Sequence, residues 1–278
     1  MAGSAGQLGR ALVDRLGPRV VWAGGRGELD VRDEAAVRAR VSAARPDVVV
    51  NATAYNRVDA AETERDEAFA VNEHGPLNLA RAADAAGALM VHVSTNYVFD
   101  GAVRRPYTED DEPRPLSAYG HSKRAGELAV TGVGDNHLIV RTSALFGRDG
   151  NRAKGGTFID RVLERARTNA PLQIVDDQEL STTYVPDLAA GMVALLDAGA
   201  RGMFHVVNEG SCTWHALAVE AVKQAGLPAK VTAVSSAELA APAPRPRYSV
   251  LSTAKYRSLG LPPLREWRAA LAAHLANV

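Results

Sequence analysis

Residues 3–12 read Gly3-Ser4-Ala5-Gly6-Gln7-Leu8-Gly9-Arg10-Ala11-Leu12, three glycines at three-residue spacing that lead into an amphipathic helix. The helical pattern continues to Leu16 and stops at Gly17-Pro18. Glycines placed in this way let the backbone approach a pyrophosphate at a helix N-terminus, where free N–H groups and the helix dipole favour anions. The stretch therefore predicts that the chain begins with a dinucleotide-binding loop.

The apolar strand that normally precedes such a loop is missing from the sequence, because only Met1 and Ala2 stand before Gly3. Two interpretations are open. The start codon was placed late, or the central strand is absent, which would leave a gap in the core and weaken cofactor binding. We favour the first interpretation.

Strand-like and helix-like patterns alternate after the glycines. Apolar, β-branched runs predict strands at residues 19–23, 46–52, 89–93 and 137–142, and apolar residues at helical spacing predict helices at 67–86 and 119–128. This alternation predicts an α/β fold with a doubly wound, Rossmann-like parallel sheet.

The pattern loosens after Phe146-Gly147. We expect residues 1–147 to form the dinucleotide-binding domain and residues 148–278 to form mostly a smaller substrate-binding lobe. Within this second part we expect helices at 158–167 and 185–198 and strands at 172–175 and 202–207. We expect some elements between about 172 and 207 to return to the Rossmann sheet. Residues 148–156 form a basic, glycine-rich loop that could be a lid, a phosphate contact or a plain surface loop.

The composition of the 278 residues favours a globular protein that binds a small ligand. Thirty-two basic residues balance thirty-two acidic ones, which gives no sign of a nucleic-acid or membrane partner. The single cysteine, Cys212, excludes an internal disulfide framework and suits a reducing compartment. No apolar run of membrane-spanning length is found, so we expect a soluble, cytoplasmic protein, and we predict no metal site.

Asp30 lies at the distance from the glycines at which an acidic residue accepts a hydrogen bond from a cofactor ribose. An aspartate in this position could also cap the helix that follows it. Arg26, nearby, could meet a 2′-phosphate, although an exposed loop arginine usually has no such role.

Tyr119 and Lys123 are spaced i, i+4, which places both side chains on one face of a helix. A phenol with a pKa of about 10 exchanges a proton near neutral pH only when its surroundings assist, and Lys123 could supply a positive charge. Ser94 and Thr95 follow a predicted strand, where they could hold a carbonyl oxygen or cap a turn. Arg245 and Arg247 flank Pro246 in a loop suited to a diphosphate and a base, or to solvent.

With these stretches assembled, the chain resembles the extended short-chain dehydrogenase/reductases, and within them the dTDP-4-dehydrorhamnose reductase family. The resemblance covers nearly the whole chain and rests on the order and spacing of its motifs. These are Gly6-Gln7-Leu8-Gly9, Leu29-Asp30-Val31, Val50-Asn51-Ala52, Val58-Asp59-Ala60-Ala61-Glu62, Ser94-Thr95-Asn96-Tyr97-Val98-Phe99, Pro106-Tyr107-Thr108-Glu109, Tyr119-Gly120 with Lys123, Arg141-Thr142-Ser143, Thr213-Trp214-His215, and Arg245-Pro246 with Ser249 and Leu251.

The resemblance implies hydride transfer from NADPH or NADH to the 4-keto group of a nucleotide-activated 6-deoxysugar, and a possible homodimer. By the family's pattern, Thr95 hydrogen-bonds the substrate carbonyl, Tyr119 donates the proton, and Lys123 lowers the Tyr119 pKa and holds the nicotinamide ribose. The remaining residues expected to contact the cofactor are Gly3, Gly6, Gln7, Leu8, Asp30, Val31, Thr53 and Ala54.

Several positions depart from the family's usual residues. Asn96 replaces an aspartate, Ala144 stands where a tryptophan usually packs on the sugar, and Thr157, Leu180 and Thr182 replace Asn, Gly and Pro. We expect these changes to gather in the substrate pocket, with Asn96, Ala144 and Arg245 as substrate-binding positions. An altered pocket beside intact catalytic residues indicates a specialised sugar, such as one made for a glycosylated natural product.

Two alternatives remain open at this point. The short N-terminus and Asn96 are also compatible with a non-catalytic, nucleotide-binding regulatory subunit of a partner enzyme. The loss of the aromatic residue at Ala144 would further allow a reductase of a non-sugar ketone, although the Arg245-Pro246 stretch argues against it.

Overall fold

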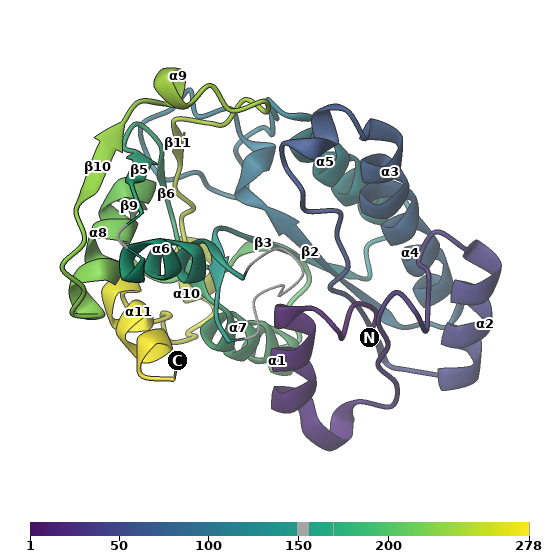
Figure 1. The fold of residues 1–278 in the computed structure, drawn as a ribbon. Helices are drawn as coiled ribbons and strands as arrows, with labels where there is room; N and C mark the ends of the chain where they lie inside the picture. The colour runs from purple at the N-terminus through teal and green to yellow at the C-terminus, as the bar shows by residue number, and fades with distance from the viewer. Residues whose placement is uncertain (149–155, 169, 278) are drawn as a thin grey trace.

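The central sheet has four parallel strands in the order β1-β2-β3-β8, of which the first three come from before residue 143 and β8 comes from later in the chain (Figure 1). This computed structural model describes residues 1–148, 156–168 and 170–277. The strands are β1 (Val48–Asn51), β2 (Leu89–Thr95), β3 (His137–Thr142) and β8 (Gly202–His205). The doubly wound α/β fold predicted from the sequence is confirmed.

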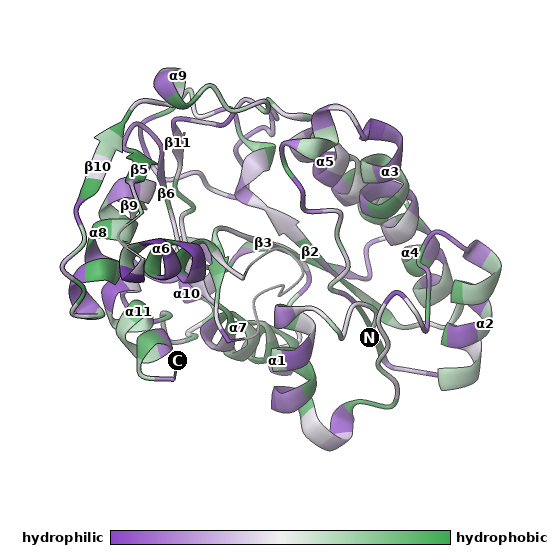
Figure 2. Ribbon diagram, in the orientation of Figure 1, coloured by the Kyte–Doolittle hydropathy of each residue, from purple (hydrophilic) through white to green (hydrophobic). Residues whose placement is uncertain are grey.

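Both faces of this sheet are covered by helices, because alternate strand residues are apolar on each side. Val50, Val91 and Leu138 pack in one cluster with α1 (Gln7–Leu16) and α7 (Val185–Asp197). Val49, Met90 and Ile139 belong to the opposite cluster, with α2 (Glu34–Ala44) and α4 (Gly75–Ala85). In Figure 2 the buried helix α7 is mostly hydrophobic, whereas α6 at the surface shows a hydrophilic face.

The N-terminal residues lie at the edge of this sheet. Ala2 pairs in parallel with both Asn51 and Gly24. Its N–H donates to the carbonyl of Val50 at 2.9 Å, and the N–H of Gly3 donates to the carbonyl of Gly24 at 2.8 Å. The segment 1–3 thus lies between β1 and Gly24 and leads directly into the glycine loop.

The strand predicted at residues 19–23 is wrong. Gly17–Arg19 form a 3₁₀ turn (η1), and the Val21 side chain is 68% exposed. The neighbouring segment, residues 1–3, forms its parallel bridge with this part of the chain at Gly24. Residues 19–23 therefore do not form a strand beside it.

The helix predicted at 67–86 is a run of three elements, α3 (Arg65–Phe69), a π-helical turn η3 (Ala70–His74) and α4. The π turn points the Asn72 side chain inward. Its Oδ1 accepts from the Tyr55 N–H, and its Nδ2 donates to the Tyr55 carbonyl and to Ser122 Oγ, each at 2.9 Å. Asn72 therefore ties the loop after β1 to α5 (Ala118–Thr131), the helix that carries Tyr119.

The C-terminal lobe is built from helices packed on short strand pairs. Its helices are α6 (Phe158–Arg167), α8 (Trp214–Gln224), α9 (Ser236–Leu239), α10 (Ala254–Ser258) and α11 (Trp267–Leu275). Its strand groups are β4 (Leu145–Phe146) with β7 (Thr183–Tyr184), β6 (Glu179–Leu180) with β9 (Cys212–Thr213) and β11 (Tyr248–Ser249), and β5 (Leu172–Val175) with β10 (Val231–Val234). No helix in the described part of the chain has the length and apolar character needed to cross a membrane.

Within residues 172–207, some elements return to the Rossmann sheet and others belong to the C-terminal lobe. Strand β8 pairs with β3, and α7 packs beneath the sheet, as expected. Strand β5 instead pairs with β10 in the C-terminal lobe, where Leu172 lies opposite Val231. The apolar residues of β5 are buried against α6 and α8 rather than against the central sheet.

Candidate active site

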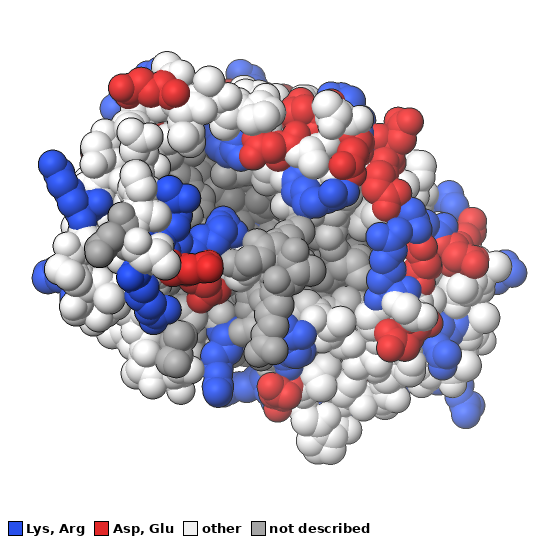
Figure 3. Space-filling model, in the orientation of Figure 1, with Lys and Arg blue, Asp and Glu red and all other residues white. Residues whose placement is uncertain are grey.

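A pocket of about 1090 Å³ lies at the carboxyl ends of the parallel strands, where ligands bind in doubly wound folds. Its walls come from the glycine loop, the loop after β1, the carboxyl end of β2, helix α5, and the end of β3 with the residues that follow it. Figure 3 shows a hollow in this face of the molecule, with basic side chains around it. A pocket of this volume can hold a dinucleotide together with a second ligand.

The glycine loop has the close approach that a pyrophosphate site requires. Gly3 has a φ of +88°, and a Cβ on Gly9 would stand 2.1 Å from the Gly3 carbonyl oxygen. Helix α1 begins at Gln7 without a side-chain cap, so its first N–H groups face the pocket rather than a side chain. The Gln7 Oε1 atom is buried without a hydrogen-bond partner, which fits a ligand that donates to it.

Replacing Gly9 by alanine is expected to weaken nicotinamide dinucleotide binding at least about tenfold, because the added methyl group would push the Gly3 backbone out of the loop. Equilibrium titration of cofactor fluorescence measures this. Gly134→Ala is the matched control for a glycine outside the pocket, because an added Cβ there would meet only Asp84 Oδ1, at 3.7 Å. Equal binding by Gly9→Ala and Gly134→Ala would contradict the role given to the loop.

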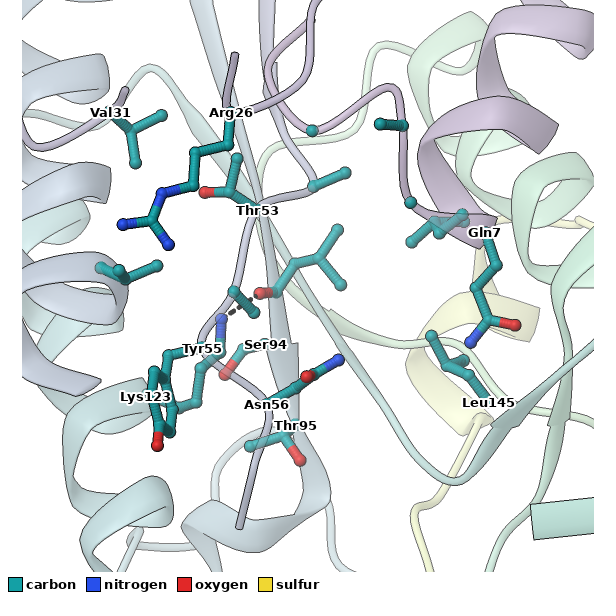
Figure 4. A pocket seen from close by; sticks show the side chains of 18 of the residues that line it. Gln7, Arg26, Val31, Thr53, Tyr55, Asn56, Ser94, Thr95, Lys123 and Leu145 are labelled. Carbon is teal, nitrogen blue, oxygen red and sulfur yellow. Dashed lines mark hydrogen bonds between the residues drawn. The ribbon is translucent and has the colours of Figure 1, made fainter. Parts of the chain in front are cut away.

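Thr95, Tyr119 and Lys123 meet at the inner end of the pocket. Thr95 ends β2, its hydroxyl donates to Asn96 Oδ1 at 3.2 Å, and it is close enough to the Tyr119 phenol to act on the pKa of that group. Tyr119 and Lys123 follow Ser117, whose hydroxyl caps α5 by accepting from the Gly120 N–H at 3.1 Å. In Figure 4, Lys123 and Arg26 lie on one side of the pocket and Gln7 on the other, with Thr53, Ser94 and Thr95 between them.

The Tyr119 phenol keeps its proton at neutral pH. Burial raises the Tyr119 pKa to about 12, and the charge of Tyr97 adds to this while the hydrogen bond from Thr95 lowers it. The expected lowering of the Tyr119 pKa by Lys123 is not seen in this structure, because the Lys123 ammonium donates to the Val93 carbonyl at 2.7 Å. A protonated phenol is what an acid catalyst of carbonyl reduction needs.

Lys123 is deeply buried at the floor of the pocket, and its charge is correspondingly costly. Burial lowers the Lys123 pKa to about 8, and the nearby Glu127 carboxylate opposes this shift. An ammonium has three donors, and the bond to Val93 uses one of them. The others are available for a ligand in the pocket.

The residues expected to contact the cofactor line this pocket together. They are Gly3, Gly6, Gln7, Leu8, Asp30, Val31, Thr53, Ala54, Tyr119 and Lys123. Asp30 does not cap the following helix, because Asp33 does so by accepting from the Ala36 N–H at 3.0 Å.

The substrate-binding candidates divide into one that lines the pocket and two that do not. Ala144 lines it, with a φ of +42°. The Asn96 amide is buried and donates to Ser249 Oγ at 2.8 Å, and Arg245 pairs with Asp59 at 2.8 and 2.9 Å. Arg245 also donates to the Ala243 carbonyl at 2.8 Å, so three of its five donors already have partners within the protein.

The other departures from the family pattern are structural in this protein. Leu180 and Thr182 are buried away from the pocket, and Thr157 caps α6 in a capping box with Asp160. Of the five departures, Ala144 alone is among the described residues that line this pocket, and the expectation that they gather where the substrate binds stays a prediction. The glycine-rich loop suggested as a lid lies mostly outside the described residues.

Sequence reasoning missed several residues of the pocket wall. Thr142 ends β3 and Ser143 follows it, both line the pocket, and Ser143 Oγ is buried without a hydrogen-bond partner. The rule that located Ser94 and Thr95, polar residues after a parallel strand, would also have found this pair. Tyr55, Asn56 and Arg57 also line the pocket, from the loop after β1, but they carry no comparable pattern. Among the described residues, no group of three His, Cys, Asp or Glu side chains is placed to hold a metal ion.

Comparison with known proteins agrees with this geometry. The family model described as RmlD substrate binding domain matches residues 1–278. The chain belongs to this family, that of the dTDP-4-dehydrorhamnose reductases.

Relatives in this family cover the chain almost completely. A dTDP-4-dehydrorhamnose reductase of Streptomyces griseus is 44% identical over 98% of this chain and 90% of its own length. A probable dTDP-4,6-dihydroxy-2-methyloxan-3-one 4-ketoreductase of Streptomyces antibioticus is 41% identical over 98% of this chain and 92% of its own length. The crystal structure of the Bacillus anthracis dTDP-4-dehydrorhamnose reductase in complex with NADP has a TM-score of 0.95 at 34% identity, and covers 100% of this chain and 98% of that one.

Proposed function

We propose that this protein is an NAD(P)H-dependent reductase of the 4-keto group of a dTDP-activated 6-deoxysugar. The observation that carries the proposal is the protonated Tyr119 phenol, which shares with Thr95 and Lys123 a pocket that begins at a dinucleotide-type glycine loop. The names of relatives that are 40–44% identical agree with it.

The residues of the site divide the work of carbonyl reduction. A reduced nicotinamide bound against the glycine loop supplies the hydride. Thr95 holds the carbonyl oxygen of the sugar, and Tyr119 donates its proton to that oxygen as negative charge develops there. Lys123 holds the nicotinamide ribose with its remaining donors and stabilises the phenolate that Tyr119 leaves behind.

Ala144 supports a sugar other than, or in addition to, dTDP-4-dehydro-L-rhamnose. A methyl group at this position of the pocket wall, in place of the indole usual in the family, leaves room beside the sugar. Relatives with names for different ketosugars, including a dTDP-4-keto-6-deoxy-D-glucose reductase of Streptomyces niveus at 40% identity, show that the family accepts such variety.

The test is turnover of a panel of dTDP-4-keto-6-deoxysugars that differ at C2, C3 and C5, with loss of nicotinamide absorbance as the readout. We expect at least one member to be reduced. Absence of cofactor oxidation with every member, by protein that binds the cofactor, would refute the proposal and favour the regulatory subunit.

The structure gives the regulatory subunit no specific support. Asn96, which motivated it, has its amide bonded to Ser249 and lies outside the pocket, while Thr95, Tyr119 and Lys123 are together. From the family resemblance we also propose a cytoplasmic homodimer. Light scattering of the purified protein tests the dimer.

The rate of reduction should fall as pH rises through about 8. Lys123 loses its charge as pH passes its lowered pKa of about 8, whereas Tyr119 remains protonated up to about 12. We therefore expect kcat/KM to be level below pH 7 and to decline about tenfold for each pH unit well above 8. A profile measured with saturating cofactor that stays level to about pH 9.5 would contradict the role given to Lys123.

A further inference from the structure

A buried series of hydrogen bonds runs from the Thr95 hydroxyl to the C-terminal lobe. Thr95 donates to Asn96 Oδ1 at 3.2 Å, and Asn96 Nδ2 donates to Ser249 Oγ at 2.8 Å. Asn96 and Ser249 are each 2% exposed and lie behind the pocket wall, whereas Thr95 lines the pocket. The Asn96 amide is therefore placed to act on the pocket through Thr95.

Both ends of this series are held by backbone contacts. Ser249 lies in β11, where it pairs with Leu180 of β6. The Tyr97 N–H donates to Thr95 Oγ1 at 3.2 Å. The turn that carries Tyr97 lies against α5, since a Cβ on Gly120 would stand 2.4 Å from the Tyr97 carbonyl oxygen. The oxygen of Thr95 is thus fixed relative to the helix that carries the phenol.

The direction of the Thr95 proton is the part of this arrangement that can change. A hydroxyl donates one hydrogen bond and accepts up to about two. In the structure the proton is directed to Asn96 Oδ1, whereas the proposed reduction needs it at the carbonyl oxygen of the sugar. An O···O distance of 3.2 Å is longer than the usual value of about 2.7–2.8 Å, so the bond to the amide is weak. The hydroxyl can turn to a carbonyl while the Tyr97 N–H keeps its oxygen in place.

A carboxylate in this place would hold the Thr95 proton more firmly than the amide does. A hydrogen bond to an ionised acceptor is roughly twice as strong as one between neutral groups. The amide oxygen of Asn96 is neutral, and the bond from Nδ2 to Ser249 leaves this oxygen as the end that faces Thr95. The departure from the family pattern at this position, asparagine for aspartate, therefore eases the turn of the hydroxyl toward a substrate carbonyl.

We propose that Asn96 is a positioning residue of the reduction, whose neutral amide, fixed by Ser249, holds the Thr95 hydroxyl and releases its hydrogen bond to the substrate carbonyl. The turn moves only the hydroxyl proton, which stays bonded to Thr95. This inference deepens the proposed function and rests on it, because it concerns the group that holds the carbonyl in the same site. It gives Asn96 a role through Thr95 rather than a contact with the sugar.

A double-mutant cycle between Asn96 and Thr95 tests the inference. Asn96→Asp, which keeps the shape of the side chain, is expected to lower kcat for a ketosugar at least about fivefold, with cofactor affinity within about twofold of wild type. Thr95→Val removes the hydroxyl and is expected to lower kcat about a hundredfold by itself. Added to Thr95→Val, Asn96→Asp should change kcat by less than about twofold, because the hydroxyl through which it acts is gone. Single-turnover kinetics with excess protein measures all four chains.

Asn96→Leu provides a second, uncharged arm of the test, which carries it if the buried carboxylate prevents folding as judged by circular dichroism. It removes both polar ends of the amide, so the Thr95 hydroxyl loses its partner on that side, and kcat should again fall at least about fivefold with Thr95 present and less than about twofold without its hydroxyl. Asn136→Asp is the matched control. Asn136 precedes β3 at the end away from the pocket and accepts from Arg201 Nε at 3.0 Å, so its variant should keep kcat within about twofold of wild type.

A purely structural role for Asn96, or a direct contact with the sugar, would lower kcat by the same factor in both Thr95 backgrounds. That result, or wild-type kcat in a folded Asn96→Asp variant, would overturn the inference and leave the proposed function standing. A wild-type chain that binds the cofactor but reduces no member of the ketosugar panel would overturn both.

Discussion

Replacement of Tyr119 by phenylalanine is expected to lower kcat for ketosugar reduction by about a thousandfold or more, with cofactor affinity within about twofold of wild type. The substitution removes the proton that burial keeps on the phenol, and we expect neither of the two other side chains described at the inner end of the pocket to replace it. Thr95 is a neutral hydroxyl, and Lys123 donates to the Val93 carbonyl. Single-turnover kinetics with bound cofactor separates this loss from any change in binding.

Tyr256→Phe is the control for loss of a tyrosine hydroxyl elsewhere. Tyr256 is 2% exposed in the core beneath the sheet and does not line the pocket. Its variant should turn over at close to the wild-type rate. A Tyr119→Phe variant that retains more than about a tenth of wild-type kcat would assign the proton to another group.

Of the substitutions described in this article, Glu127→Leu is expected to destabilise the protein most. Its free energy of unfolding should be lower than that of the wild type by about 3–5 kcal/mol. Glu127 is on the same helix as Tyr119 and is fully buried, where it accepts from Arg141 Nε at 2.7 Å and Nη2 at 2.8 Å. Arg141 on β3 is 1% exposed, so removal of the carboxylate would leave a guanidinium charged and unpaired in the core. Urea unfolding monitored by circular dichroism measures the change.

A double variant distinguishes a broken ion pair from simple loss of packing. Glu127→Leu with Arg141→Met removes both charges, and should recover much of the stability lost in Glu127→Leu alone. Glu112→Leu, which breaks an exposed pair with Arg114 at 2.7 Å, should change stability little. If the double variant were as unstable as the sum of its single variants, the charge argument would be wrong.

The sheet could be predicted from the sequence because its strands are buried on both faces. Apolar runs such as Leu138-Ile139-Val140 indicated β3 within the bounds that the structure has. Strand β5 was also located correctly, but its place in the molecule was not. Its partner β10 begins at Val231, far along the chain, and local patterns carry no information about such pairings.

The residues of the site could be predicted where the spacing of residues along the chain determines which side chains lie together. The i, i+4 relation of Tyr119 and Lys123 and the glycine loop led to residues that do share one pocket. Arg245 shows the limit of this reasoning. Its partner Asp59 is 186 residues away, so a motif that suggested a diphosphate contact could not reveal that the guanidinium is held by a carboxylate.

The pKa of Tyr119 was also beyond prediction from spacing. An ammonium four residues away indicated a lowered value, but the direction depends on where the ammonium points and on how deeply the phenol is buried. The structure raises the pKa because desolvation outweighs the other influences. The pKa of Asp30 also depends on hydrogen bonding and burial. It falls to about 2 because the hydrogen bond from the Arg32 side chain outweighs the effect of burial.

The most direct test of the central claim is the fate of the hydride. Reduced cofactor deuterated at C4 of the nicotinamide should transfer its label to C4 of the sugar, seen by NMR as loss of the C4 proton signal in the dTDP-sugar product. Wild-type protein and Tyr256→Phe should both give this product, and Tyr119→Phe should not. A reduced sugar without deuterium at C4, or label at another carbon, would contradict the assignment of this pocket as a 4-ketoreductase site.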